Sequence, residues 1–146
     1  MKGGPAAGTL APMVAFAALW VVALAGVFLA ALGLLGFMAP QRVRSFLGGF
    51  AASLPRHCLE LCIRFAMGWA FVVAAPHLAL PALIASAGWI LLGTTVFMAL
   101  VPWRIHRGFA QRTVPRAMAW LPLIAVVSTA AGAALVGLVL AGIGGA

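Results

Sequence analysis

The stretch from Ala11 to Ala39 contains no charged residue. A helix that crosses a bilayer needs about 20 mainly apolar residues, so this stretch is long enough to span a membrane. The rest of the chain agrees, because 66% of its residues are hydrophobic and only 7% are charged. Average soluble domains carry about 25% charged residues, and disorder requires low hydrophobicity. The sequence therefore predicts an all-α integral membrane protein.

Four membrane-spanning helices are predicted by the apolar stretches. Their approximate ranges are Met13–Ala39, His57–Ala75, Pro81–Val101 and Met118–Ile143. Lys2 and the small residues around Ala23-Leu24-Ala25 are features of a signal peptide. The apolar run is much longer than the roughly 7–15-residue core of such a peptide, so we interpret it as a retained helix. We expect residues 1–146 to form a single membrane domain, a four-helix bundle.

Two of the three connections between these spans are rich in arginine. The first holds Arg42, Arg44 and Arg56, with Arg64 just beyond it, and the other holds Arg104, Arg107, Arg112 and Arg116. Cytoplasmic loops of membrane proteins collect Lys and Arg. We therefore expect both basic loops to face the cytosol of a bacterial inner membrane, and both termini to lie outside.

The formal net charge is +8, and Glu60 is the only acidic residue. Such an excess suggests nucleic acid in a soluble protein, but this chain has no nucleic-acid-binding motif and its arginines flank apolar spans. We expect contact with anionic lipid headgroups or with a partner protein, and none with nucleic acid. The candidate contact residues are Arg42, Arg44, Arg56, Arg104, Arg107, Arg116 and Trp103.

Apolar residues recur at helical spacing in the first basic loop. They are Val43, Phe46, Leu47, Phe50 and Leu54. This pattern predicts a short amphipathic helix lying in the headgroup plane. The second loop is a poorer copy, with Trp103, Ile105 and Phe109 among its basic residues. Trp103 and Trp120 are expected at the cytosolic boundary of the membrane.

An offset of 60 residues aligns Leu32–Arg56 with Leu92–Arg116. Nine of these 25 positions are identical, including the contiguous Phe37-Met38-Ala39 and Phe97-Met98-Ala99. A repeat at a fixed period indicates internal duplication, with repeat one at about 12–76 and repeat two at about 77–143. Similar membrane exits are the alternative explanation. Each repeat contains two spans, so the copies should share one orientation and be related by a pseudo-twofold axis along the membrane normal.

Two short segments also carry a family resemblance: Pro40-Gln41-Arg42 after the first span, and Arg64-Phe65-Ala66-Met67-Gly68 in the second. The repeat resembles short two-helix bacterial inner-membrane proteins of unknown function, built as helix, basic amphipathic segment, helix. The resemblance covers about residues 20–75 and, more faintly, 85–140. It implies an architecture and no activity.

Small residues at four-residue spacing let the backbones of membrane helices approach closely. In the second span these are Ala66, Ala70 and Ala74, and in the fourth they are Gly132, Ala133, Gly137 and Ala141. We expect these stripes to face other helices, within the chain or in an oligomer. Ala and Gly are common throughout this chain, which is the alternative reason for their spacing.

A polar cluster lies at the start of the second span, in His57-Cys58-Leu59-Glu60-Leu61-Cys62-Ile63-Arg64. His57, Cys58 and Cys62 are candidate ligands for zinc or copper(I), but three ligands without a matching set elsewhere make a weak pattern. Glu60 and Arg64 stand four residues apart, which favours a structural ion pair over proton coupling. For His77 we expect a turn role rather than haem ligation.

The chain has no Asp and no Tyr, and no nucleophile–base–acid arrangement is evident. We therefore expect no enzyme activity and no cofactor. The leading hypothesis is an accessory or assembly subunit of a larger bacterial membrane complex. The alternative is a small transporter or channel formed by the two repeats or by a homodimer. Its candidate midplane polar residues are Ser86, Thr94, Thr95, Ser128 and Thr129.

Overall fold

The computed structural model describes residues 5–50 and 53–144, and these ranges contain helices and no β-strand. The helices are α1 (Pro5–Met38), α2 (Pro40–Phe50), α3 (Leu54–Ala74), α4 (Pro81–Leu100), α5 (Trp103–Ala117) and α6 (Leu121–Gly144). Two single 3-10 turns, η1 (Ala75–His77) and η2 (Met118–Trp120), precede α4 and α6. The predicted all-α fold is confirmed.

Four helices in the described ranges are long and apolar enough to cross a membrane: α1, α3, α4 and α6. Three of these four helices begin at other residues than predicted, and the first begins at Pro5 rather than Met13. The second span begins at Leu54 rather than His57, because Pro55 suits the first turn of a helix, where its missing N–H is not needed. The fourth begins at Leu121, after the 3-10 turn that takes up Met118.

Both basic connections are helical. In the first, α2 forms over residues 43–50 of the segment predicted to be amphipathic, and Gly48-Gly49 does not interrupt it, whereas Leu54 begins α3 instead. In the second, α5 runs on through Pro115 to Ala117. The 60-residue offset also aligns Pro55-Arg56 with Pro115-Arg116, and these lie in the first turn of α3 and inside α5, respectively.

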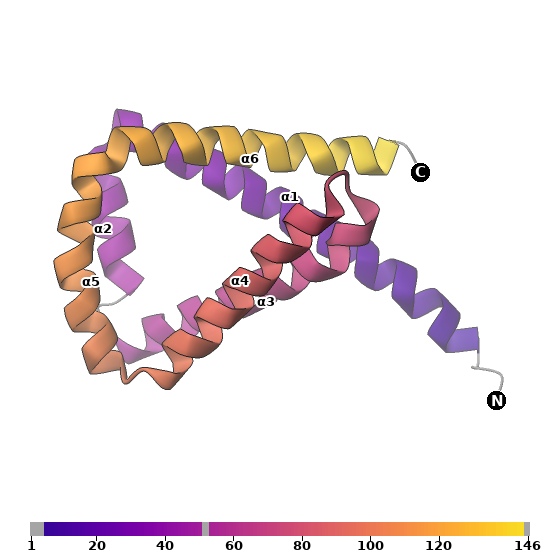
Figure 1. Cartoon of the computed structure of the whole chain (residues 1–146), viewed down its shortest axis with the longest axis horizontal. Coiled ribbons are helices and arrows are strands. Elements are labelled where there is room, and N and C mark those ends of the chain that lie inside the picture. Colours follow the sequence, from indigo (N-terminus) through magenta and orange to yellow (C-terminus); the bar gives the residue numbers. More distant parts are fainter. Residues whose placement is uncertain (1–4, 51–52, 145–146) are drawn as a thin grey trace.

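The long helices are arranged as two pairs: α1 packs along α6, and α3 packs along α4. Figure 1 shows that the pairs cross at one end of the molecule and diverge toward the other, where α2 and α5 run next to each other between them. The first residues of α1 and the last of α6 lie far from α2 and α5. Both basic helices therefore lie at one end of the spans.

The buried core lies where the two pairs cross. It combines Ala18, Leu19, Val22 and Ala25 of α1 with Ala70, Phe71 and Ala74 of α3, Ala75 and Leu78 of the following turn, Ile84 of α4 and Val139 of α6. Five of these eleven side chains are alanine, and such small side chains let the helices approach closely there. Toward α2 and α5 the two pairs separate.

Candidate lipid and partner-helix interface

Helix α2 is attached to the long helices through Val43, whereas Phe46 and Leu47 of its apolar face are exposed. Val43 is only 3% exposed, whereas Arg42 and Arg44 are exposed on either side of it. Arg56, just inside α3, reaches back so that its guanidinium lies beside Gly49. An amphipathic helix held in this way presents its arginines at the end of the spans, where headgroups would lie.

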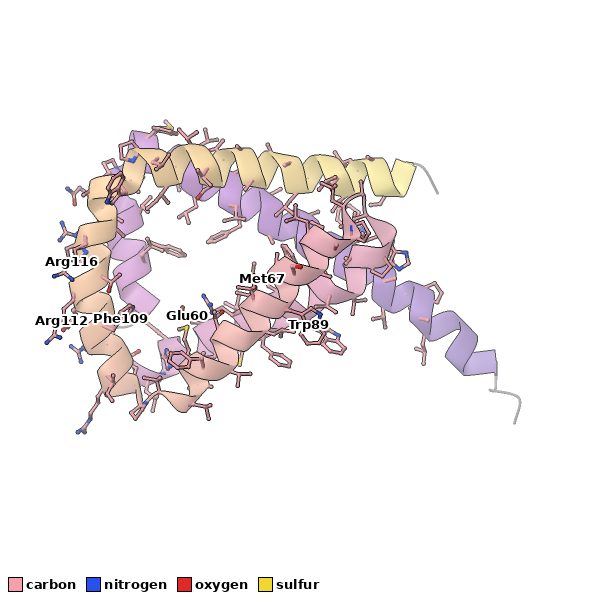
Figure 2. All side chains as sticks on the ribbon, viewed as in Figure 1. Glu60, Met67, Trp89, Phe109, Arg112 and Arg116 are labelled. Atoms are coloured by element: carbon pink, nitrogen blue, oxygen red, sulfur yellow. The ribbon has the colours of Figure 1, made fainter. Side chains whose placement is uncertain are left out.

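Helix α5 is attached more loosely, and most of its described side chains are exposed. Arg112 and Arg116 project from its outer side, away from the helix pairs (Figure 2). The Arg107 guanidinium lies 5.6 Å from the centroid of the Trp103 ring, a cation–π arrangement. The Trp103 indole nitrogen is buried and has no hydrogen-bond partner among the described residues.

All six arginines proposed as contact residues, Arg42, Arg44, Arg56, Arg104, Arg107 and Arg116, are exposed. None of them forms an ion pair with a carboxylate of the described residues. Their charges therefore remain available to an anion outside the chain.

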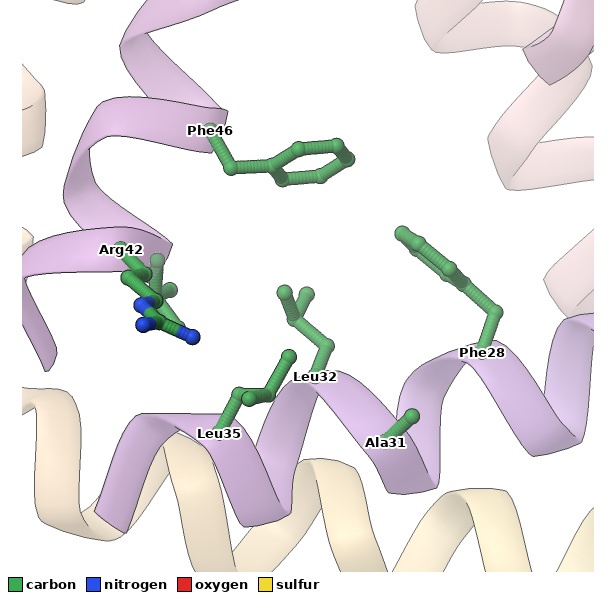
Figure 3. Close-up of a pocket in the computed structure, with 7 residues that line it drawn as sticks. Phe28, Ala31, Leu32, Leu35, Arg42 and Phe46 are labelled. Atoms are coloured by element: carbon green, nitrogen blue, oxygen red, sulfur yellow. The ribbon is translucent and has the colours of Figure 1, made fainter. Parts of the chain in front are cut away.

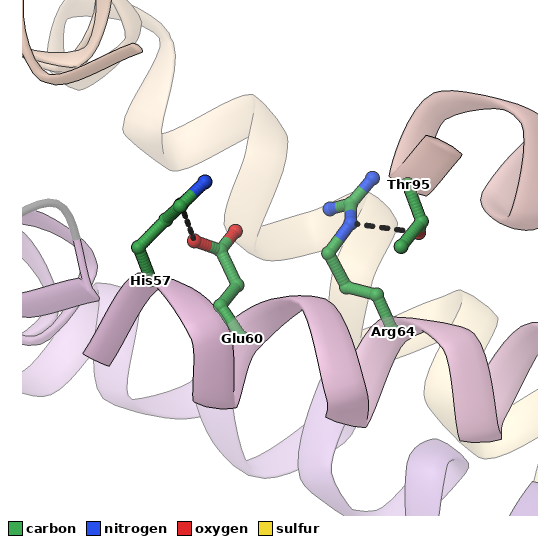
Figure 4. A network of polar contacts seen from close by, with 4 residues as sticks. All are labelled: His57, Glu60, Arg64 and Thr95. Carbon is green, nitrogen blue, oxygen red and sulfur yellow. Dashed lines mark hydrogen bonds and ion pairs between the residues drawn. The ribbon is translucent and has the colours of Figure 1, made fainter. Parts of the chain in front are cut away.

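Three members of the polar cluster of α3, His57, Glu60 and Arg64, form a row along one side of the helix (Figure 4). His57 is 4% exposed, and its Nδ1 lies 3.9 Å from a carboxylate oxygen of Glu60. The expected Glu60–Arg64 ion pair was wrong. Arg64 instead extends across to α4, where its Nη2 donates to Thr94 Oγ1 at 2.9 Å and its Nε donates to Thr95 Oγ1 at 3.4 Å.

Arg64 prefers the threonines because the close packing of α3 on α4 brings acceptors within its reach. Thr94 and Thr95 also donate to carbonyls one turn back on their own helix, at 2.8 Å to Ile90 and 2.6 Å to Leu91. Each hydroxyl thus donates to its own backbone and accepts from Arg64. This contact joins α3 to α4 by side chains.

The two cysteines carry free thiols and are both exposed, whereas the neighbouring His57 is buried. The three proposed ligands therefore do not share one face of α3. Within residues 5–50 and 53–144, no group of three or more His, Cys, Asp or Glu is placed to hold a metal ion. His77 is exposed in the turn between α3 and α4, as expected.

The small-residue stripes are divided between packed and open positions. Ala70 and Ala74 are buried in the core, while Ala66 is exposed. Gly132 is buried against α1, where an added Cβ would collide with backbone atoms of Gly26 and Ala30. The other three positions on α6, Ala133, Gly137 and Ala141, are exposed. At Gly137 an added Cβ would meet no atom within 4 Å.

Sequence reasoning missed an apolar pocket of about 290 Å³ between α1 and α2 (Figure 3). Its lining residues are Phe28, Ala31, Leu32, Leu35, Arg42, Val43 and Phe46. The four-residue spacing of Arg42 and Phe46 placed them on one side of α2. No pattern along the chain indicates that α1 forms the facing wall, because that depends on the angle between the two helices.

Comparison of the chain with protein-family models, with curated proteins and with solved structures found no match. The assignment therefore rests on the helices themselves. Four of them are able to span a bilayer, and they define a multi-pass helical membrane protein.

Proposed function

We propose that the protein is a non-enzymatic accessory or assembly subunit of a larger bacterial membrane complex. In the most apolar part of each span, between 17 and 28% of the residues are buried within the chain. Most of the lateral surface therefore faces either lipid or other protein. The open small-residue face of α6 favours protein.

The observation that carries the proposal is that α6 has small residues on two sides, one packed against α1 and the other open. On one side, Gly132 brings the backbones of α6 and α1 into contact. On the other, Ala133, Gly137 and Ala141 form a second small-residue face with nothing packed against it. Lipid tails pack as well against large side chains, whereas a helix gains close van der Waals contact where side chains are small. This face suits a helix of a partner subunit or of a second copy.

The register of the two helix pairs supports internal duplication. At the repeat offset of 60 residues, Gly68 corresponds to Ser128 and Leu92 corresponds to Leu32. If the two copies are equivalent, a contact between Gly68 and Leu92 should be matched by one between Ser128 and Leu32. Gly68 and Leu92 contact each other in the α3·α4 pair. Leu32 and Ser128 line one small pocket of about 70 Å³. The first span of each copy thus pairs with the second span of the other, which is the arrangement expected of two copies around a pseudo-twofold axis.

The placement of α2 and α5 supports an orientation with both basic loops in the cytosol of a bacterial inner membrane and both termini outside. A single cysteine at Ser45, in a chain with Cys58 and Cys62 replaced by Ala, tests this orientation. A membrane-impermeant maleimide should label it only after the cells are opened. Labelling of intact spheroplasts would contradict the orientation.

The transporter alternative has less support. It needs polar groups free to meet a solute near the bilayer midplane. Ser86 and Thr129, two of its candidates, donate at 2.7 and 2.8 Å to carbonyls of their own helices. Thr94 and Thr95 are engaged by Arg64. These contacts favour helix packing over solute binding.

The decisive experiment compares Gly137→Leu with Gly93→Leu. Both glycines are exposed, and an added Cβ meets no atom within 4 Å at either, so both variants should fold. Tagged full-length chains are extracted gently from native membranes, and the mass of each assembly is measured. The wild type and Gly93→Leu should run in one complex of constant composition, while Gly137→Leu should run as the free chain. A wild type that runs as a monomer, or a Gly137→Leu variant that stays assembled, would overturn the proposal.

A further inference from the structure

The pocket between α1 and α2 combines an apolar wall with a single cationic residue. We propose that it binds one anionic membrane phospholipid, with an acyl chain against the wall and the phosphate on Arg42. The inference rests on the proposed membrane location. It adds a defined ligand site to the general attraction between arginines and headgroups.

The wall is built from both helices. Ala31, Leu32 and Leu35 face the pocket from α1, and Phe46 reaches over from α2 (Figure 3). The Phe28 and Phe46 rings close one side, with their centroids 6.0 Å apart. The volume of about 290 Å³ is near the lower end of the range for small-molecule pockets, roughly 300–1,000 Å³. That size suits part of one acyl chain better than a whole amphiphile.

Arg42 is the only charged residue of the lining, and it lies one helical turn from Phe46. Its side chain is exposed, and the guanidinium forms no ion pair or hydrogen bond with the described residues. The only acidic residue of the chain, Glu60, lies instead beside His57 on α3. The guanidinium therefore lacks an internal counterion, at the end of the spans where phosphate groups would lie.

The two parts of the site have different roles. An acyl chain that enters the pocket leaves one apolar environment for another, so the wall contributes shape and little affinity. A guanidinium donates short, charge-assisted hydrogen bonds to phosphate oxygens, often two at once. A zwitterionic headgroup carries its own cation and gains less. The preference for anionic over zwitterionic lipid should therefore depend on Arg42.

The test measures lipid selectivity by electron paramagnetic resonance. The purified full-length chain is placed in phosphatidylcholine bilayers with spin-labelled phosphatidylglycerol or phosphatidylcholine, and the motionally restricted fraction is recorded. The wild type should prefer phosphatidylglycerol, and Arg42→Gln should lower that preference about fivefold, as expected for one charge at the membrane surface. Ala31→Trp, which fills the pocket from an exposed position, should reduce the restricted component for both lipids.

Arg112→Gln is the matched control, because Arg112 projects from the outer side of α5 away from the pocket (Figure 2). It removes the same charge and should leave the preference nearly unchanged. An equal loss in Arg112→Gln and Arg42→Gln would show diffuse electrostatics and overturn the site. Binding of free glycerol phosphate that displaces the labelled lipid would identify a soluble-anion site, which would also overturn it. So would a chain that is dimeric in the bilayer and becomes monomeric on Ala31→Trp.

The two proposals fail separately. Lipid selectivity is measured on the isolated chain, whereas the accessory role is measured on the assembly with Gly137→Leu. An Arg42-dependent preference in a chain with no partner would leave the lipid site standing and remove the accessory role. Loss of the preference with an intact Gly137-dependent complex would do the reverse.

Discussion

The helix pairs α1·α6 and α3·α4 both pack closely at glycines, but they differ in the contacts that hold them together. In α1·α6 the backbones touch at Gly26 and Gly132, and an added Cβ at either residue would meet backbone of the other helix. In α3·α4 the closest approach is at Gly68 and Gly88, and side chains add the bond from Arg64 to Thr94. The described residues show no side-chain hydrogen bond between α1 and α6, so close packing holds that pair, whereas α3·α4 also has a polar side-chain link.

Chain connectivity gives a reason for the difference. Helices α3 and α4 are joined by a short turn, Ala75–Leu80, so bringing them together costs little loop entropy. Helices α1 and α6 are the first and last long helices of the chain and have no such link. Their association must come from the contact itself. We therefore expect a single added methyl group to lower the free energy of unfolding more at the α1·α6 contact than at the α3·α4 contact.

The largest effect is expected from Gly132→Ala. Its Cβ would collide with backbone atoms of Gly26 and Ala30, which cannot move unless the helices separate. The free energy of unfolding should fall by about 1–3 kcal/mol, the usual cost of overpacking. Denaturant unfolding in detergent micelles measures the change. Gly137→Ala, at an open position of the same helix, is the control. Equal stability of the two variants would contradict the prediction that the contact of α6 with α1 at Gly132 cannot accept an added methyl group.

A smaller loss is expected from Gly68→Ala. Here the new Cβ would lie 2.8 Å from Leu92 Cγ and 3.1 Å from the Gly88 carbonyl oxygen. A leucine side chain can shift where backbone cannot, so the cost should be about 1 kcal/mol, at the low end for overpacking. The same unfolding measurement applies. A loss greater than that of Gly132→Ala would reverse the predicted order of the two pairs.

The polar link of α3·α4 should contribute less still. A double-mutant cycle with Arg64→Met and Thr94→Val isolates it, and Thr94 is exposed, so little packing is lost with the hydroxyl. The coupling should be about 0.6 kcal/mol, typical of interhelical hydrogen bonds in membranes. Additive effects of the two substitutions would mean that the Arg64–Thr94 bond does not help to hold α3 and α4 together.

The smallest effect concerns the turn that joins α3 to α4. Leu80 has φ 64° and ψ 50°, a left-handed conformation that strains residues with a Cβ, and its side chain is 60% exposed. Leu80→Gly relieves this strain, but glycine also gives the unfolded backbone more conformational freedom, which opposes folding. The net effect should be a rise of about 0.5 kcal/mol in the free energy of unfolding. A higher unfolding midpoint would show it. Destabilisation would mean that the leucine side chain matters more than the turn.

Local patterns predicted the helices well and their partners poorly. The long apolar runs and the spacing around Val43 located the spans and α2, because these features depend on neighbours along the chain. The expected Glu60–Arg64 pair failed although both residues lie on one helix. The acceptors that Arg64 uses, Thr94 and Thr95, come from α4, and no pattern within α3 reveals them.

The sequence by itself determined that the chain is helical, that four helices can span a bilayer and that the arginines gather in two connections. Apolar length and charge distribution are sufficient for this, because backbone polar groups in lipid must bond within each helix. The tertiary structure decided which glycines are packed and which are open, and where α1 and α2 enclose a pocket. Both depend on how helices cross, and in a bilayer close side-chain fit rather than hydrophobic burial sets that geometry.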